Sequence, residues 1–213
     1  YASRCRFIKN VRPWPEQAAR QPKRYSGGGD VPTMNIGVLA LQGAVSEHRL
    51  ALEACGARAR EVRTPHDLAE IEGLVVPGGE STTLRHLLRN AGLWESLLVW
   101  EKPILGTCAG AILLGSCDDE TLGKMELQLN RNAYGRQQES FEARIRLDEG
   151  DPFPGVFIRA PGVTATSGAC RPIAWHNGNI VGAVQPPHMA LTFHPELTGD
   201  RRLHQRWLEM IPR

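Results

Sequence analysis

The sequence predicts an α/β protein in three layers, with a mostly parallel central sheet, helices on both faces and antiparallel strands in its second half. Three observations predict this. Short buried apolar runs alternate with helical patterns between residues 35 and 114, which is typical of a parallel sheet. Later runs are short and separated by turn residues, among them the hairpin signal Asn177-Gly178. Finally, 213 residues with 41% hydrophobic content suffice for one full core.

Charge and composition divide the chain into two parts. Residues 1–33 hold seven Lys or Arg against two acids, four prolines and the triplet Gly27-Gly28-Gly29, so we expect a flexible basic extension. Residues 34–213 are expected to form a single domain. Since the basic excess lies in the extension, the domain gives no electrostatic reason to propose a nucleic acid partner.

The first half of the chain should alternate strands with helices. Glycines at the ends of the apolar stripes, such as Gly56 and Gly92, mark helix stops. The expected strands are 36–41, 57–62, 73–76 and 103–107, and the expected helices are 43–55, a turn from 65, 84–90, 94–100 and the run after Cys108.

The second half should contain shorter strands. Residues 141–147 alternate polar and apolar side chains, as a half-exposed strand does. Further strands are expected at 156–159, 173–175, 180–183 and 190–193, followed by a helix over about 200–210.

Gly106-Thr107-Cys108-Ala109-Gly110 lies between two apolar runs. With cysteine in place of serine this is the G-x-S-x-G nucleophile elbow, a strand, a tight turn and a helix. The flanking glycines avoid Cβ collisions, and the helix N-terminus favours a thiolate. The alternative is a buried structural cysteine beside turn glycines, so the motif needs a base and an oxyanion hole elsewhere.

Phe193-His194-Pro195-Glu196 follows the last apolar strand. In an extended chain His194 and Glu196 point the same way, so the carboxylate would orient a histidine that acts as the base for Cys108. The alternative is a surface strand end with an incidental acid.

The other histidines give weaker signals. His48 is expected to be packed and hydrogen-bonded, and His176 and His188 to be exposed in polar turns. Three more, on helix faces, carry no signal: His66, His86 and His204.

The loop Gly78-Gly79-Glu80-Ser81 ends the third strand. One of its backbone N–H groups, with that of Ala109, could hold the oxyanion of a tetrahedral intermediate. It is not a P-loop, because no Gly-Lys-Ser/Thr follows. The alternative is a plain turn in which Ser81 or Thr82 caps the next helix.

Five widely spaced cysteines without a C-x-x-C pair argue for a reducing compartment, hence a cytoplasmic location, and against a disulfide framework. No Cys/His spacing indicates a metal site. No apolar run reaches the length of about 18 residues that a membrane span needs.

The elbow and His194-Pro195-Glu196 together resemble the class I (triad) glutamine amidotransferases, which have a flavodoxin-like fold. Longer strings resemble the glutaminase subunit of pyridoxal 5′-phosphate synthase, the PdxT/SNO family, from about Asn35 to the C-terminus. These strings are 41–43, 77–83, 131–137, 140–142, 155–161 and 193–198.

The resemblance implies that Cys108 is the nucleophile, His194 the general base and acid, and Glu196 the orienting carboxylate. It implies that L-glutamine is the substrate and that no cofactor is needed, pyridoxal 5′-phosphate being the pathway product. Residues implied in glutamine binding are Gly79, Glu80, Ser81, Arg131, Ile158 and Arg159, with the oxyanion near Gly78, Gly79 and Ala109.

The implied partner is a (β/α)₈ synthase subunit in a large hetero-oligomer, with Gln42 as a candidate interface residue. Two alternatives stay open. One is the amidotransferase subunit of another pathway, such as imidazole glycerol phosphate synthase. The other is a non-catalytic binding protein with a reactive cysteine, against which the histidine–carboxylate pair argues.

Overall fold

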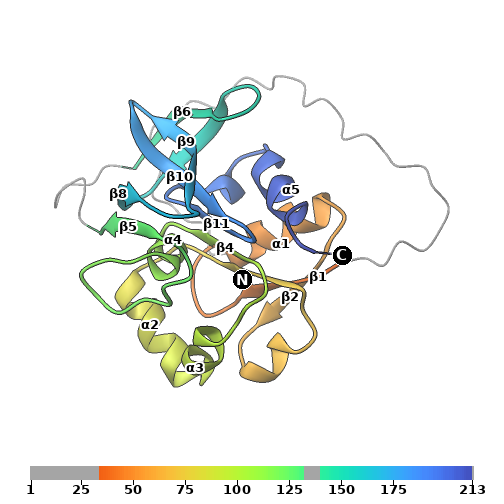
Figure 1. Cartoon of the computed structure of the whole chain (residues 1–213). Coiled ribbons are helices and arrows are strands. Elements are labelled where there is room, and N and C mark those ends of the chain that lie inside the picture. The colour runs from red at the N-terminus through yellow and green to blue at the C-terminus, as the bar shows by residue number, and fades with distance from the viewer. Residues whose placement is uncertain (1–33, 132–139, 213) are drawn as a thin grey trace. The chain divides into compact units, whose positions relative to one another are not determined.

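The computed structural model describes residues 34–131 and 140–212 (Figure 1). The expected extension, 1–33, lies outside the described residues, as does most of the 131–137 string. The described residues build a nine-stranded sheet in the order β2-β1-β3-β4-β11-β10-β9-β6-β7 and a two-stranded sheet of β5 and β8.

The strands from β2 to β11 in this order are parallel. The apolar runs of β1, β3 and β4 are buried almost throughout, as expected of strands covered on both faces. Their bounds are β1 Asn35–Leu39, β2 Arg58–Val62, β3 Gly73–Val76, β4 Ile104–Thr107 and β11 His188–Leu191.

The other half of the large sheet is antiparallel, as predicted. Asn177 and Gly178 join two of its strands with φ angles of 47° and 81°, which is the tight hairpin that this dipeptide favours. The strands are β6 Phe141–Leu147, β7 Phe153–Phe157, β9 Arg171–His176 and β10 Asn179–Gln185.

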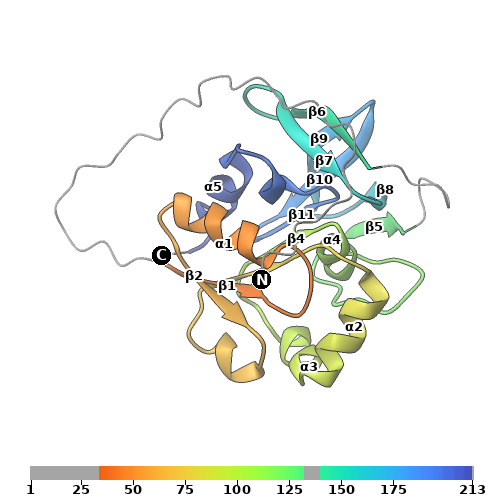
Figure 2. The same ribbon diagram turned by 180° about the vertical axis from the view of Figure 1, so that it is seen from behind.

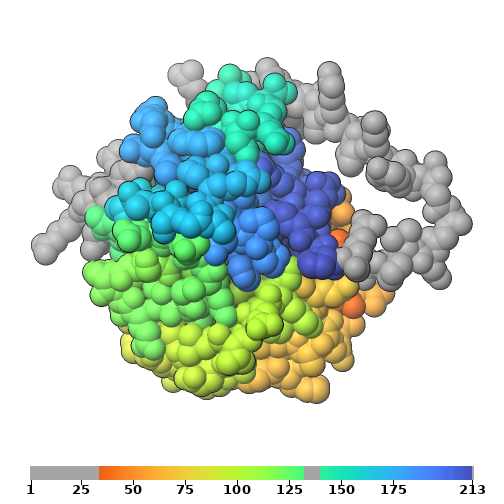
Figure 3. Space-filling model, in the orientation of Figure 1, coloured from red at the N-terminus to blue at the C-terminus, as the bar shows by residue number. Residues whose placement is uncertain are grey.

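Helices cover both faces of the parallel half (Figures 1 and 2). On one face α1 and α5 pack on Ile36, Val38 and Leu105; on the other, α2, α3 and α4 pack on Leu74 and Ile104. Their bounds are α1 Val45–Ala54, α2 Ser81–Asn90, α3 Leu93–Leu98, α4 Ala109–Leu114 and α5 Arg202–Leu208, with 3₁₀ turns η1 Pro65–Leu68 and η2 Pro195–Leu197. Side chains fill the spaces between the ribbons, as the space-filling view illustrates (Figure 3).

The end of β7 and the small sheet of β5 and β8 differ from the prediction. β7 ends at Phe157 and does not continue to Arg159, because Arg159 has φ 44° and turns the chain out of the strand. The strands β5 (Leu127–Asn130) and β8 (Gly162–Thr166) pair with each other and were not predicted. β8 has no buried residue, so it lacks the apolar pattern that sequence prediction depends on.

Candidate active site

Three neighbouring strands, β3, β4 and β11, end at the same edge of the sheet. Thr107 at the end of β4 pairs with Leu191 of β11, and Gly106 with Val76 of β3. The loops that follow these strands carry Gly78, Cys108 and His194. Ligands of open α/β sheets bind at this carboxyl edge, so the topology brings the predicted residues together.

Cys108 occupies the sharp turn between β4 and α4. Its φ of 50° and ψ of −106° are rare for a residue with a side chain. A Cβ on Gly106 would lie 2.6 Å from the Gly110 backbone, and one on Gly110 would collide with the Val76 carbonyl. Both glycines of the elbow are therefore required for the close approach of strand and helix, as predicted.

His194 and Glu196 form a buried pair. The Nδ1 atom of His194 lies 2.7 Å from Oε1 of Glu196, and the residues are 7% and 3% exposed. The extended geometry expected between them was wrong, since Pro195 begins the 3₁₀ turn η2 and Glu196 lies within it. Proline is favoured at the first position of a helical turn, and this turn brings the carboxylate back to the ring.

The other edge of the His194 ring is adjacent to Cys108. A Cβ on Gly78 would overlap Cε1 of His194 and lie 3.1 Å from Cβ of Cys108, so both side chains pack against this glycine. Nε2 of His194 is buried without a hydrogen-bond partner. Burial opposes the imidazolium, but the Cys108 side chain and the Glu196 carboxylate outweigh it and raise the pKa of His194 to about 10.

A cavity of about 340 Å³ opens beside the Cys108 sulfur. It is lined by Gly79, Glu80, Ser81, Cys108, Ile112, Arg131 and Arg159. Six of these were predicted site residues, and Ile112 of α4 was not. Ile158, also predicted, is not among the lining residues, but its carbonyl oxygen lies 3.8 Å from the Cys108 sulfur.

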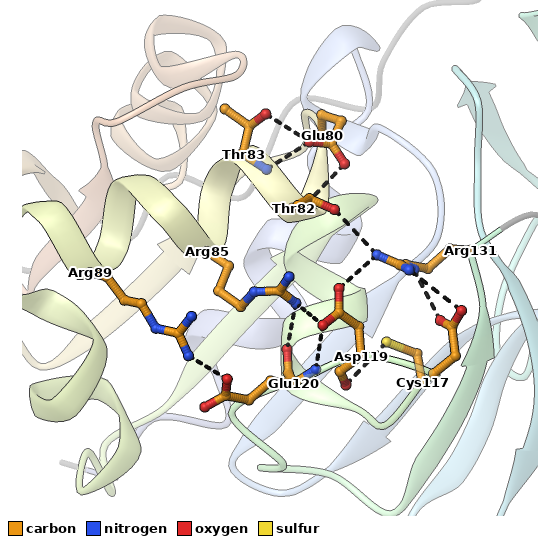
Figure 4. A network of polar contacts seen from close by, with 10 residues as sticks. Glu80, Thr82, Thr83, Arg85, Arg89, Cys117, Asp119, Glu120 and Arg131 are labelled. Atoms are coloured by element: carbon orange, nitrogen blue, oxygen red, sulfur yellow. Dashed lines mark hydrogen bonds and ion pairs between the residues drawn. The ribbon is translucent and has the colours of Figure 1, made fainter.

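Glu80 caps α2, whereas the alternative interpretation of this loop placed the cap at Ser81 or Thr82 (Figure 4). Its carboxylate accepts hydrogen bonds from the backbone N–H groups of Thr82 and Thr83 at 2.9 and 2.6 Å and from the Thr83 hydroxyl at 2.7 Å. Burial acts against the charge, but these bonds outweigh it and lower the pKa of Glu80 to about 2. The carboxylate therefore stays ionised and fixes the turn that borders the cavity.

Gln42 packs over the same turn. Its Nε2 atom donates to the Glu80 carbonyl at 3.0 Å. Gly79 has φ 140°, and a Cβ on it would lie 2.6 Å from Nε2 of Gln42. The loop after β1 thus supports the predicted oxyanion loop from outside the cavity.

Arg131 lies at the cavity wall within an acidic network (Figure 4). Its Nε lies 3.0 Å from Asp118, and its Nη1 lies 3.0 Å from Asp119 and 3.3 Å from the Thr82 hydroxyl. Asp119 also pairs with Arg85 of α2. In contrast, no hydrogen bond or ion pair engages the exposed Arg159 within the described parts of the chain, so its charge is available to a ligand.

The model of the SNO glutamine amidotransferase family matches residues 38–213. The chain belongs to the SNO glutamine amidotransferase family. A curated relative from Streptomyces avermitilis, "Pyridoxal 5'-phosphate synthase subunit PdxT", is 48% identical over 187 residues, covering 83% of this chain and 93% of the relative. The subunit of the same name from Geobacillus kaustophilus is 48% identical over 186 residues, covering 84% and 95%.

Solved structures agree with the family fold. A "Crystal structure of glutamine amidotransferase" has TM-score 0.77 and 40% identity, covering 83% of this chain and 98% of that one. The structure of PurLQS from Thermotoga maritima has TM-score 0.60 and covers 84% and 100%, at 15% identity, and so supports the fold alone. The predicted α/β class and the resemblance to this amidotransferase family are confirmed.

Two buried histidines of this SNO family chain were not predicted to lie near the site. His204 of α5 carried no signal, yet it is fully buried and its Nε2 lies 3.1 Å from Nδ1 of His48. His48 is packed and hydrogen-bonded, as expected, and its Nε2 lies 3.4 Å from Oε2 of Glu196. A buried histidine on a helix face has no sequence signature of its own, because its partners come from other elements.

The expectation that His188 is exposed was wrong. His188 is 9% exposed, and its Nδ1 accepts a hydrogen bond from the Ile104 backbone at 3.2 Å. Burial, with a contribution from Lys124, lowers its pKa to about 4. His176 is half-buried against Phe141 and Phe157. In both cases neighbouring strands of the sheet cover a histidine that the sequence places among polar turn residues.

The described residues contain no cluster of His, Cys, Asp or Glu side chains that could hold a metal ion. Within the same residues, no helix is both long and apolar enough to cross a membrane.

Proposed function

We propose that this protein is the glutaminase subunit of pyridoxal 5′-phosphate synthase, hydrolysing L-glutamine to L-glutamate and ammonia. One observation carries the chemistry: Cys108 at a strained elbow, beside the buried His194–Glu196 pair, borders a cavity with two arginines. The names of the 48% identical relatives support the pathway. These names favour pyridoxal 5′-phosphate synthesis over the pathway of another amidotransferase subunit. The His194–Glu196 pair argues against a non-catalytic binding protein.

In the proposed mechanism, His194 accepts the proton of Cys108 and the thiolate attacks the side-chain amide carbon of glutamine. Glu196 holds the ring by its Nδ1 atom and stabilises the imidazolium. His194 then gives this proton to the amide nitrogen as the C–N bond breaks, so that ammonia departs and a glutamyl thioester remains on Cys108. Water activated by His194 hydrolyses the thioester, and glutamate leaves with the thiol restored.

The oxyanion of each tetrahedral intermediate is proposed to bind backbone N–H groups of Gly78 or Gly79 together with that of Ala109. These groups belong to the loop after β3, where Gly78 packs against Cys108, and to the first residue of α4, which follows Cys108 in the chain. Such preorganised donors commonly contribute about 3 kcal/mol each to the transition state.

The polar ends of glutamine are proposed to bind along the cavity wall. Arg159 would pair with the α-carboxylate, since its charge is not engaged by described residues, while Arg131 is partly neutralised by Asp118 and Asp119. A guanidinium suits a carboxylate because it donates two parallel hydrogen bonds. Gly79, Glu80, Ser81 and the backbone of Ile158 would complete the glutamine site.

The partner is proposed to be a (β/α)₈ synthase subunit, in a large hetero-oligomer that receives the ammonia directly. Free ammonia is largely protonated in neutral water and is then a poor nucleophile, so transfer within a complex preserves its reactivity. Gln42 remains the candidate contact, on the loop after β1. No cofactor is proposed, and the free cysteines suit the cytoplasm. Residues 34–213 are proposed as the single catalytic domain, with 1–33 as an extension.

Glutamate release should rise at least tenfold when a (β/α)₈ pyridoxal 5′-phosphate synthase subunit is added to the full chain with glutamine. The measurement is an enzyme-coupled glutamate assay at fixed glutamine and rising synthase concentration. The matched control adds the synthase subunit of imidazole glycerol phosphate synthase, which should give no stimulation. Stimulation by that control alone would overturn the proposed pathway.

A further inference from the structure

A cluster of three buried polar side chains lies behind the candidate triad. His48 of α1, Thr107 of β4 and His204 of α5 are each 0% exposed. His48 lies beside Oε2 of Glu196, and Thr107 and His204 in turn contact the two ring nitrogens of His48. Three separate elements therefore meet at His48, which in turn faces the proposed catalytic carboxylate. None of these side chains lines the cavity, so their role concerns Glu196 and not the substrate.

The two oxygens of Glu196 have different surroundings. Oε1 is bonded to His194 at 2.7 Å. Oε2 is buried and has no hydrogen-bond partner at close range, and Nε2 of His48 lies 3.4 Å away. A buried carboxylate oxygen without a donor is costly, so the proton position on His48 decides whether Oε2 is stabilised.

The contact between the two histidines fixes that proton. One proton must lie between Nδ1 of His48 and Nε2 of His204, which are 3.1 Å apart. If His48 donated it, neutral His204 would carry its own proton on Nδ1, which is buried without a partner. The Nε2 lone pair of His48 would then accept from the Thr107 hydroxyl and leave Oε2 of Glu196 without a donor, so one buried group at each end stays unsatisfied.

In the opposite arrangement each imidazole N–H of His48 and His204 has an acceptor. His204 donates from Nε2 to Nδ1 of His48, and the bare Nδ1 of His204 requires no acceptor. His48 is then protonated on Nε2, which points between Oε2 of Glu196 and the Thr107 hydroxyl oxygen at 3.4 and 3.2 Å. Only this tautomer supplies the donor that Oε2 lacks.

Both histidines are neutral in this arrangement. Burial lowers the pKa of His48, an effect opposed by Glu196 and Glu47 and reinforced by His194. Burial also lowers the pKa of His204 to about 3; His48 and Arg201 act in the same direction and Glu196 acts against them. A neutral donor is useful here, because a second buried cation would compete with the imidazolium of His194 for the same carboxylate.

We propose that His48 and His204 are positioning residues that extend the triad: His204 fixes the tautomer of His48, and His48 holds Glu196 ionised and aligned with His194. This rests on the proposed function, in which Cys108, His194 and Glu196 carry the reaction. It adds a chain of polar contacts that runs from His204 of α5 through His48 of α1 and Glu196 to His194, the proposed base for Cys108.

The kinetic test compares His48→Phe with His48→Gln in the presence of the synthase subunit. His48→Phe fills the space but removes the donor, so kcat should fall about tenfold to a hundredfold, as is typical of outer hydrogen-bond partners, while KM changes less than twofold. His48→Gln places an amide N–H near the position of Nε2 and should recover most of kcat. The matched control, His188→Gln, changes a buried histidine at the other end of β11 and should leave kcat unchanged.

The pH profile separates positioning from mere packing. Without the donor, Glu196 should take up a proton at higher pH, so the acidic limb of kcat in His48→Phe should shift upward. An unshifted profile with kcat within twofold of the unaltered protein would overturn the proposal. If the unaltered protein releases no glutamate at all, the proposed function fails instead.

A measurement on the unaltered full chain does not depend on how the variants fold. Imidazole ¹⁵N chemical shifts, assigned by the signals lost in His48→Gln and His204→Gln, should show both histidines neutral and protonated on Nε2. Protonation of His48 on Nδ1, or on both nitrogens, would overturn the proposal whatever the kinetics show.

Discussion

Replacing Cys108 by alanine is expected to lower glutamate release at least about 10⁴-fold, the loss typical of removing a catalytic nucleophile. No other described side chain is placed to form the glutamyl thioester, since the sulfur borders the cavity and adjoins His194. The variant should fold, because alanine fits the space left by the 4% exposed side chain. The measurement is the glutamate assay with the synthase subunit present.

Cys170→Ala is the matched control for Cys108→Ala. Cys170 is also buried, at 5% exposure, but it lies just before β9 in the core cluster that contains Leu74 and Ile104. Its replacement should cost about 1 kcal/mol of stability, as an average core substitution does, and should leave kcat unchanged. Retained activity in Cys108→Ala, or an equal loss in Cys170→Ala, would contradict the assignment of the nucleophile.

Gly78→Ala should lower kcat about 10²-fold, the cost of displacing a catalytic group by about 1 Å. The added Cβ would overlap Cε1 of His194 and come within 3.1 Å of Cβ of Cys108. The ring is held from behind by Glu196, so it can yield only by leaving its position beside the sulfur. Steady-state glutamate release measures the loss of kcat, and thermal melting of the same preparation measures any change in stability.

Gly199→Ala provides the comparison for this second variant. Gly199 lies in the loop after η2, and a Cβ there would meet no atom within 4 Å. It should behave as the unaltered protein in both measurements. If Gly78→Ala keeps more than half of the kcat, the close packing of Gly78 against both side chains has no catalytic consequence and the site geometry described above is wrong.

The elbow could be predicted because its requirements are local. A residue in the strained turn at Cys108 needs small neighbours two positions away on each side, and the sequence shows them as Gly106 and Gly110. The alternation of apolar runs with helix stops likewise predicted the parallel half of the sheet, whereas the strand order that brings Gly78, Cys108 and His194 side by side was not predicted. The elbow glycines and the apolar runs can be recognised because both depend on the spacing of residues along the chain.

Other features depend on residues that meet only in the folded protein. Glu80 is the cap of α2 because its carboxylate reaches two backbone N–H groups, a role that the sequence suggested only for the hydroxyls of Ser81 and Thr82. His188 and His204 looked uninformative, since the β4 backbone and His48 that bind them lie far away in sequence. The strand pair β5–β8 arises from pairing between segments more than thirty residues apart, and β8 has no buried residue to give it an apolar pattern.

The central claim is a glutamyl thioester on Cys108. Its most direct test uses the full chain with the synthase subunit, mixed with radiolabelled glutamine and quenched in acid during turnover. The account predicts label bound to the peptide that contains Cys108, released by hydroxylamine and absent from Cys108→Ala. Glutamate release without any label on that peptide, or label retained by Cys108→Ala, would contradict it.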